Sequence, residues 1–183
     1  RSLVATFDDP EVQALLAAAA SNSYPLLVVV PNVVKTNWAR EVGLWTPGRT
    51  ATVVHGDGND VDAFSDVVIV NYEILDRHVG WLGRFGFKGM VVDEAHFIKN
   101  LGSQRSQNVL ALGARIREQV RDPLMLALTG TPLITERHGE KKTHKRFGEY
   151  IDTYRLMDAV NDGATLQILY EGKTADSALN EKH

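Results

Sequence analysis

Residues 90–100 read Met-Val-Val-Asp-Glu-Ala-His-Phe-Ile-Lys-Asn, and this stretch decides the predicted fold. Its apolar run, Met90 to Val92, is typical of a buried β-strand. The strand delivers two adjacent carboxylates, Asp93 and Glu94, to its carboxyl end, which is where ligands bind in open α/β sheets. An Asp at that place can bind Mg²⁺, and a neighbouring Glu can orient or deprotonate a water molecule. A solvated acidic turn after a strand is the simpler alternative for the same two residues.

Strands and helices alternate along the rest of the chain. The apolar runs predict strands of one sheet over residues 26–30, 51–54, 67–70, 89–92 and 124–128. Cap and turn signals predict helices over residues 10–20, 33–44 and 103–121, and a short helix that begins at Tyr72. A parallel sheet with helical crossovers is covered on both faces, so we predict an α/β domain with three layers. The strands of such a sheet point the same way, which should bring Asn71, Asp93 and Thr129 to its carboxyl edge.

The composition narrows the class of protein without naming it. The chain of 183 residues is long enough for one α/β domain with an extension. Its apolar content of 44% is ordinary for a globular protein, and no apolar run is as long as a membrane span. The absence of cysteine excludes disulfide frameworks and favours an intracellular setting, cytoplasmic if the source is bacterial. The net charge of −3 excludes a strongly basic nucleic-acid coat but leaves room for a local DNA-binding patch. A first residue other than Met favours a piece of a longer protein.

Four short segments follow one another in a characteristic order. They are Pro25–Pro31 (Pro-Leu-Leu-Val-Val-Val-Pro), Val67–Glu73 (Val-Val-Ile-Val-Asn-Tyr-Glu), Asp93–His96 (Asp-Glu-Ala-His, the pattern of a DEAH box) and Leu126–Pro132 (Leu-Ala-Leu-Thr-Gly-Thr-Pro). This series resembles the first motor domain of superfamily 2 helicases and translocases. Ile98-Lys99-Asn100 and the helix with Trp38-Ala39-Arg40-Glu41 look most like the SWI/SNF-type double-stranded DNA translocases. The resemblance covers residues 11–134.

The resemblance implies a RecA-like lobe over residues 1–134 and, over residues 135–183, a basic loop and a connector towards a second lobe. It implies that Asp93 binds Mg²⁺ and that Asp93 and Glu94 form the catalytic pair. The residues implied to couple nucleotide state to DNA are His96, Thr129, Gly130 and Thr131. The residues implied to contact DNA are Lys35, Trp38, Asn71, Tyr72, Lys99 and Asn100. The structural alternatives are a solvated Lys35, a half-buried Trp38, a helix-capping Asn71 and a plain turn over residues 129–131.

The phosphate-binding loop of such motors is not recognisable in this sequence. A P-loop needs Gly-x-x-x-x-Gly-Lys-Ser/Thr, and the family places its end just before a helix of the type Val-Gln-Ala-Leu. This chain has that helix from Val12, but Asp9-Pro10-Glu11 occupies the Gly-Lys-Thr positions. Pro lacks a backbone donor, and each acid repels a phosphate by roughly 1 to 4 kcal/mol at about 4 Å. Gly172-Lys173-Thr174 reads as a surface turn, because Gln167 stands where the first Gly of a P-loop belongs.

The last quarter of the chain carries a second resemblance. Its segments look like the region after the first motor domain in type I restriction enzyme motor subunits, and they are Phe147–Asp152, Asp158–Ala164 and Tyr170–Lys173. Arg137–Arg146 is the only dense basic stretch. A solvated loop is the favoured interpretation of that stretch, and a loop that contacts DNA phosphates is the alternative.

Two functions remain open at this point. The resemblance implies a parent protein that couples ATP hydrolysis to movement along double-stranded DNA, with Mg²⁺ and ATP as cofactors, a second RecA-like lobe as partner and no membrane. The second lobe of such motors supplies an arginine to the transferring phosphoryl group. No second lobe fits in 183 residues, so this chain alone should bind ATP weakly or not at all, and duplex DNA weakly and without sequence preference. The alternative is a non-catalytic motor-lobe remnant that acts as a weak DNA-binding or structural module.

Overall fold

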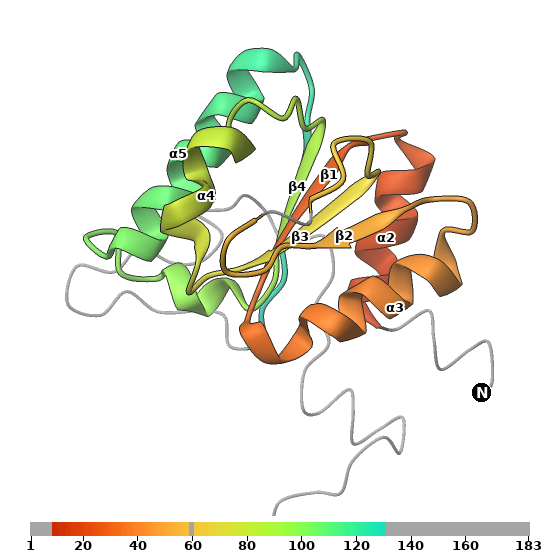
Figure 1. Ribbon diagram of the computed structural model, residues 1–183, viewed down its shortest axis with the longest axis horizontal. Helices are drawn as coiled ribbons and strands as arrows, with labels where there is room; N and C mark the ends of the chain where they lie inside the picture. The colour runs from red at the N-terminus through yellow and green to blue at the C-terminus, as the bar shows by residue number, and fades with distance from the viewer. Residues whose placement is uncertain (1–8, 59–60, 131–183) are drawn as a thin grey trace, which may run out of the picture. The chain divides into compact units, whose positions relative to one another are not determined.

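The central sheet of the computed structural model has five strands in the order β2-β3-β1-β4-β5 (Figure 1). The structure describes residues 9–58 and 61–130. The strands are β1 (Leu26–Val30), β2 (Ala51–Val53), β3 (Val67–Asn71), β4 (Gly89–Val92) and β5 (Leu124–Ala127). Every neighbouring pair is parallel, so the predicted sheet is confirmed, with strand ends within one residue of those expected.

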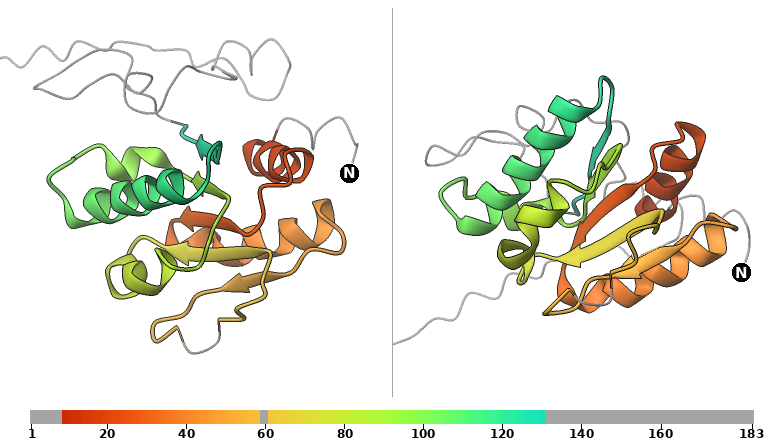
Figure 2. Two further views of the ribbon diagram at one scale, coloured as in Figure 1. Left: turned by 90° about the horizontal axis from the view of Figure 1, so that it is seen from above. Right: turned by 45° about the horizontal axis from the view of Figure 1, so that its top comes forward.

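Helices cover both faces of this sheet. They are α2 (Pro10–Ala20), α3 (Lys35–Trp45), α4 (Leu75–Leu82) and α5 (Gln104–Gln119), with short 3-10 helices η1 (Asn32–Val34) and η2 (Ala95–Ile98). Helices α2 and α3 pack on one face, and α4 and α5 on the other (Figure 2), which confirms the three predicted layers. Among the described residues, no helix combines the length and the apolar content that crossing a bilayer requires.

Two predicted helix boundaries were wrong, each for a local reason. The helix expected from Val33 begins as the 3-10 helix η1 and becomes α-helical only at Lys35. The helix expected from Tyr72 begins at Leu75, because the amide of Ile74 donates to the Asn71 carbonyl in a turn that precedes α4. A tight turn and a helical turn share the same residue preferences, so the sequence does not separate them.

The central strands are buried along their whole length, because both faces of the sheet are covered. Along β1, Leu27 and Val29 join the apolar cluster under α4 and α5. The alternate residues join the cluster under α2 and α3, and these are Leu26, Val28 and Val30. Each such side chain contributes about 1.5 to 3 kcal/mol when fully buried. The continuous apolar runs of the sequence therefore follow from two-sided burial.

The order of the strands creates a topological switch point between β1 and β4. From the carboxyl end of β1 the chain leaves through α3 towards β2, whereas from the carboxyl end of β4 it leaves through α5 towards β5. Strands β1 and β4 are neighbours, so the two connections separate in opposite directions beside each other. In open α/β sheets, ligands bind at such a switch point, outside the carboxyl ends of the strands. Asp93 and Glu94 follow β4 at this place.

Candidate functional site

Asp93 is held by three donors at the carboxyl end of β4. Its carboxylate accepts a hydrogen bond from Trp38 Nε1 at Oδ2 (3.0 Å) and one from the Glu94 amide at Oδ1 (2.7 Å). Its backbone carbonyl accepts from the Tyr72 hydroxyl at 2.5 Å. Its own amide donates to the Val29 carbonyl of β1 at 2.9 Å. The side chain and the backbone of Asp93 are therefore both fixed before any ligand is present.

Glu94 adopts a left-handed backbone conformation, with φ 47° and ψ 53°. A residue with a Cβ pays roughly 1 to 2 kcal/mol for this conformation, so the surrounding contacts must hold it. Its Oε2 lies 2.9 Å from His96 Nδ1, and the next residue, Ala95, donates its amide to the Leu128 carbonyl at 2.7 Å. The turn after β4 is thereby tied to the end of β5.

Three of the residues predicted to couple nucleotide state to DNA lie around this turn, and they are His96, Thr129 and Gly130. His96 contacts Glu94 directly, as described. The Leu128 amide donates to the Val92 carbonyl at 2.9 Å, so Thr129 and Gly130 leave β5 at the same edge of the sheet as Asp93. Thr131 lies outside the described residues. The predicted gathering of Asn71, Asp93 and Thr129 at one edge follows from the parallel register.

Negative charge accumulates around Asp93. Burial raises the pKa of Asp93, and the carboxylates of Glu94 and Asp9 raise it further, while the hydrogen bonds from Trp38 and from the Glu94 amide lower it. Glu11 lies near by on α2. Burial, together with the carboxylates of Asp93 and Asp9, raises the pKa of Glu11 to about 7. The surroundings of Asp93 thus favour a cation or a proton over an anion.

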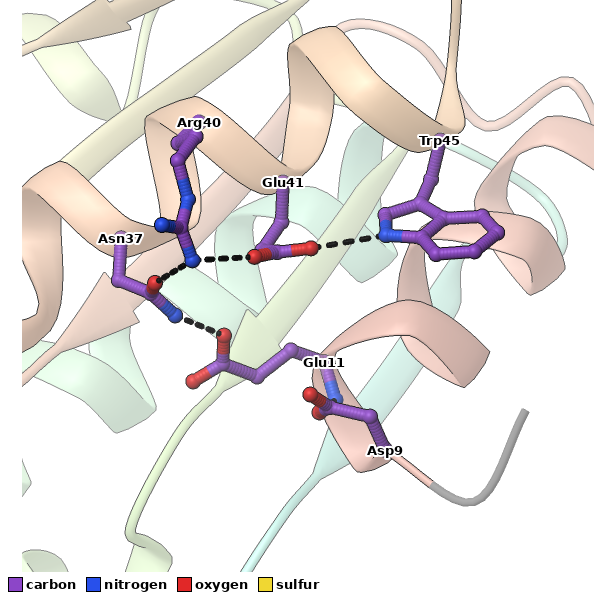
Figure 3. A network of polar contacts seen from close by, with 6 residues as sticks. All are labelled: Asp9, Glu11, Asn37, Arg40, Glu41 and Trp45. Atoms are coloured by element: carbon purple, nitrogen blue, oxygen red, sulfur yellow. Dashed lines mark hydrogen bonds and ion pairs between the residues drawn. The ribbon is translucent and has the colours of Figure 1, made fainter. Parts of the chain in front are cut away.

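The start of α2 is occupied by its own acids. Asp9 caps the helix, and its Oδ1 accepts from the Glu11 amide at 3.0 Å. Pro10 follows at the first helical position and brings no donor. The Glu11 carboxylate turns to α3, where its Oε2 accepts from Asn37 Nδ2 at 2.8 Å (Figure 3). The Glu11 amide and the side-chain amide of Asn37 are thus already paired with carboxylates of the lobe itself.

The network continues along α3 and ends in a buried acid. Arg40 donates to Asn37 Oδ1 at 2.8 Å and to Glu41 Oε1 at 2.9 Å. The other oxygen of Glu41 accepts from Trp45 Nε1 at 2.8 Å. Glu41 is only 4% exposed, and these partners satisfy both of its oxygens (Figure 3). No pattern in the sequence marks Asn37 as part of this network, and the only signal for Glu41 is an acid at a core-facing position of a helix.

The acids around Asp93 fit a magnesium ion better than they fit phosphates. Mg²⁺ is usually held by one or two carboxylates together with waters and substrate phosphates. Each oxygen of Asp93 accepts one hydrogen bond and keeps a lone pair, which suits that mode. Within the part of the chain that the structure describes, no three His, Cys, Asp or Glu residues gather as a metal site. The acids at the start of α2, Asp9 and Glu11, do not fit a triphosphate.

Three residues expected to contact DNA are buried. Trp38 is 0% exposed, Asn71 2% and Tyr72 3%, so none of them offers surface to a duplex. Trp38 and Tyr72 instead hold Asp93, which corrects the expected roles. Asn71 ends β3 rather than capping a helix, and its Nδ2 donates to Glu73 Oε2 at 2.6 Å.

The other residues expected to contact DNA have accessible side chains. Lys35 is half-buried at the start of α3, with its Nζ 3.5 Å from the Val54 carbonyl. Lys99 is half-buried and Asn100 is exposed, just after η2. Lys35 lies after β1, and Lys99 and Asn100 after β4, so all three sit beyond carboxyl ends of the sheet.

Comparison with known proteins decides the family. Residues 89–183 match the family model of the SWI2/SNF2 ATPases. The chain belongs to the SWI2/SNF2 ATPase family. It is 35% identical over 123 residues to the ISWI chromatin-remodeling complex ATPase ISW2 of Saccharomyces cerevisiae, covering 62% of this chain and 10% of that relative. It is 36% identical over 118 residues to the helicase swr1 of Aspergillus fumigatus, covering 60% of this chain and 6% of that relative.

A solved member of the SWI2/SNF2 ATPase family shares the fold. The Sulfolobus solfataricus SWI2/SNF2 ATPase core in complex with dsDNA matches with a TM-score of 0.54 and 29% identity, over 64% of this chain and 24% of that chain. The predicted RecA-like architecture and the resemblance to superfamily 2 motors are thereby confirmed. The chain spans about a tenth or less of the curated relatives named above. The predicted boundary at residue 134 and the likeness to restriction motors lie outside the described residues.

Proposed function

We propose that this chain is the first motor lobe of an ATP-dependent double-stranded DNA translocase. The observation that carries the proposal is the acidic pair Asp93-Glu94 at the switch point of a parallel sheet, with Asp93 fixed through Trp38 and Tyr72. Family membership supports the ATPase part. The solved relative in complex with dsDNA supports the DNA part.

In the parent protein, Asp93 would bind Mg²⁺ through its free lone pairs. Glu94 would orient the water molecule that attacks the nucleotide, and His96 would fix the Glu94 carboxylate. Thr129, Gly130 and Thr131 would couple the state of the site to the rest of the motor, since the chain leaves β5 beside it. Mg-ATP, when bound, supplies the phosphoryl chemistry, which needs the second lobe as well.

The lobe alone is proposed to have no turnover. Asp9 and Glu11 place carboxylates where motors of this kind hold phosphates, and Pro10 adds no backbone donor. This observation favours the second candidate function for the isolated chain, which is a non-catalytic lobe that contacts DNA weakly.

Duplex DNA would bind along the carboxyl edge of the sheet through a few phosphate contacts. Lys35 is the first candidate, with Lys99 and Asn100 beyond the end of β4. The net charge of −3 opposes the approach of DNA, so binding should be weak and indifferent to sequence.

Fluorescence anisotropy of a labelled duplex across a salt series tests the proposal. The logarithm of the affinity should fall with the logarithm of the salt concentration at a slope of about −0.9 per phosphate, for about 2 to 4 phosphates. Lys35→Ala should reduce the slope by about 0.9 and weaken all sequences alike. Lys88→Ala is the matched control, because Lys88 is exposed at the opposite end of β4. Duplex binding that is undetectable even at low salt would overturn the DNA part of the proposal.

A further inference from the structure

Trp38 joins two elements that the sequence keeps far apart. It lies in α3, and its indole donates to the carboxylate of Asp93, 55 residues later at the end of β4, at 3.0 Å. The side chain is 0% exposed. A buried indole N–H needs an acceptor, and here the acceptor is the carboxylate at the switch point.

Asp93 accepts hydrogen bonds from residues that pack on the two opposite faces of the sheet. Trp38 belongs to the apolar cluster under α2 and α3, whereas Tyr72 belongs to the cluster under α4 and α5. Tyr72 holds the backbone carbonyl of Asp93, and Trp38 holds its side chain. A movement of α3 would therefore turn the carboxylate while Tyr72 keeps the backbone in place.

The first turn of α3 is partly exposed, with Lys35 half-buried and Thr36 exposed. Lys35 begins the helix one turn before Trp38, and Val33 just ahead of it is 89% exposed. Residues one turn apart lie on neighbouring positions of a helix surface, so a pull on Lys35 reaches Trp38 through a rigid helical turn. No other described side chain donates to the Asp93 carboxylate.

We propose that Trp38 is a positioning residue that transmits a displacement of the first turn of α3 to the carboxylate of Asp93. Engagement of Lys35 by a phosphate of duplex DNA would reorient Asp93, and so change how it presents its free lone pairs to a cation. The DNA step rests on the proposed function, whereas the link between Trp38 and Asp93 does not.

The three tryptophans of the chain make the link measurable. Each indole has a different acceptor, with Trp45 on Glu41 and Trp81 on His78, so the three indole N–H signals of a ¹⁵N-labelled sample report three places. Asp93→Asn should shift the Trp38 signal and leave the other two unchanged. Trp45→Phe and Trp81→Phe assign the signals by elimination, even if Trp38→Phe fails to fold.

Addition of a short DNA duplex to the full chain tests the transmission. The Trp38 indole signal and the ¹³Cγ signal of Asp93 should move together as anisotropy reports binding, and Lys35→Ala should abolish both movements. Trp38→Phe should leave DNA affinity within about twofold but remove the movement of Asp93, which a merely structural role for Trp38 would not do. Duplex binding without movement at Asp93 would overturn the transmission. Absence of duplex binding would overturn the proposed DNA function and the transmission with it, while the Asp93→Asn arm separately decides the positioning role.

Discussion

The amide of Asn37 donates a hydrogen bond of 2.8 Å to the carboxylate of Glu11, and this contact ties the first turn of α2 to α3 (Figure 3). It places the Glu11 carboxylate near Asp93 and Asp9. Burial is the largest cause that raises the pKa of Glu11, and the carboxylates of Asp93 and Asp9 raise it further. The raised pKa of Glu11 therefore follows from its partly buried place beside two other acids.

Glu11 should make the stability of the lobe fall as the pH rises. Its pKa is about 7 in the folded chain against an ordinary value of 4.5, so the folded state binds more protons than the unfolded state between these values. The stabilisation that the raised pKa of Glu11 contributes is fully present below about pH 4.5 and is lost as the pH rises through about 7. Because Glu11 is half-exposed, solvent screening reduces the effect to about 1 kcal/mol.

The measurement is the free energy of unfolding in urea at about pH 5 and about pH 8. Glu11→Gln should flatten the difference between the two values by about 1 kcal/mol, whereas Glu118→Gln, at an exposed position of α5, should leave it as it is. If the pH dependence of the unfolding free energy is the same in Glu11→Gln as in the unaltered chain, then Glu11 has the same pKa in the folded and unfolded states.

The lobe should bind Mg-ATP with a Kd of about 1 mM or weaker, which corresponds to about −4 kcal/mol. The reason is the pair of carboxylates, Asp9 and Glu11, at the start of α2. Titration of a fluorescent ATP analogue measures the affinity. A Kd in the low micromolar range would place the phosphate loop elsewhere, and Lys173→Ala would then show whether Gly172-Lys173-Thr174 is that loop.

Gly89 should tolerate no side chain, because it begins β4 between two neighbouring strands. A Cβ there would lie 2.9 Å from Leu26 Cδ1 and 3.2 Å from the Leu124 carbonyl oxygen. Gly89→Ala should therefore destabilise the fold by about 1 to 3 kcal/mol. Gly43 lies inside α3 with nothing within 4 Å of a Cβ, so Gly43→Ala should stabilise it by about 0.5 to 1 kcal/mol. Thermal unfolding of both variants measures the contrast, and equal melting temperatures would contradict it.

The strands could be predicted from the sequence because their burial is two-sided. The run Leu26–Val30 is apolar at every position, since each face of β1 meets a helical layer. The first residues of the helices that follow β1 and β3 were predicted less accurately than the strands. The reason is that η1 and the turn at Asn71 use the same local hydrogen bonds as a first helical turn.

The position of the acidic pair could also be predicted, but its partners could not. The apolar run that ends at Val92 and is followed by two acids, Asp93 and Glu94, predicts the end of a strand. The contacts of Trp38 with Asp93 and of Asn37 with Glu11 join residues 55 and 26 positions apart, and they depend on how the helices pack on the sheet. A resemblance gives the order of the motifs but not the exposure of each side chain, and a contact with DNA is therefore expected of Trp38 although its side chain is buried.

A divalent cation should bind weakly at Asp93 even without nucleotide. Mn²⁺ serves as the probe, because it broadens NMR signals near it and takes oxygen ligands as Mg²⁺ does. The Trp38 indole donates to Asp93 and should broaden first, whereas Trp81, whose indole donates to His78 on α4, should broaden little. A single carboxylate implies a Kd on the order of 1 mM, since most ligands of such an ion are waters. Asp93→Asn should remove the preference for Trp38, and Asp76→Asn, an exposed position in the first turn of α4, should preserve it. Equal broadening of the Trp38 and Trp81 signals would show that Mn²⁺ has no preferred binding site at Asp93.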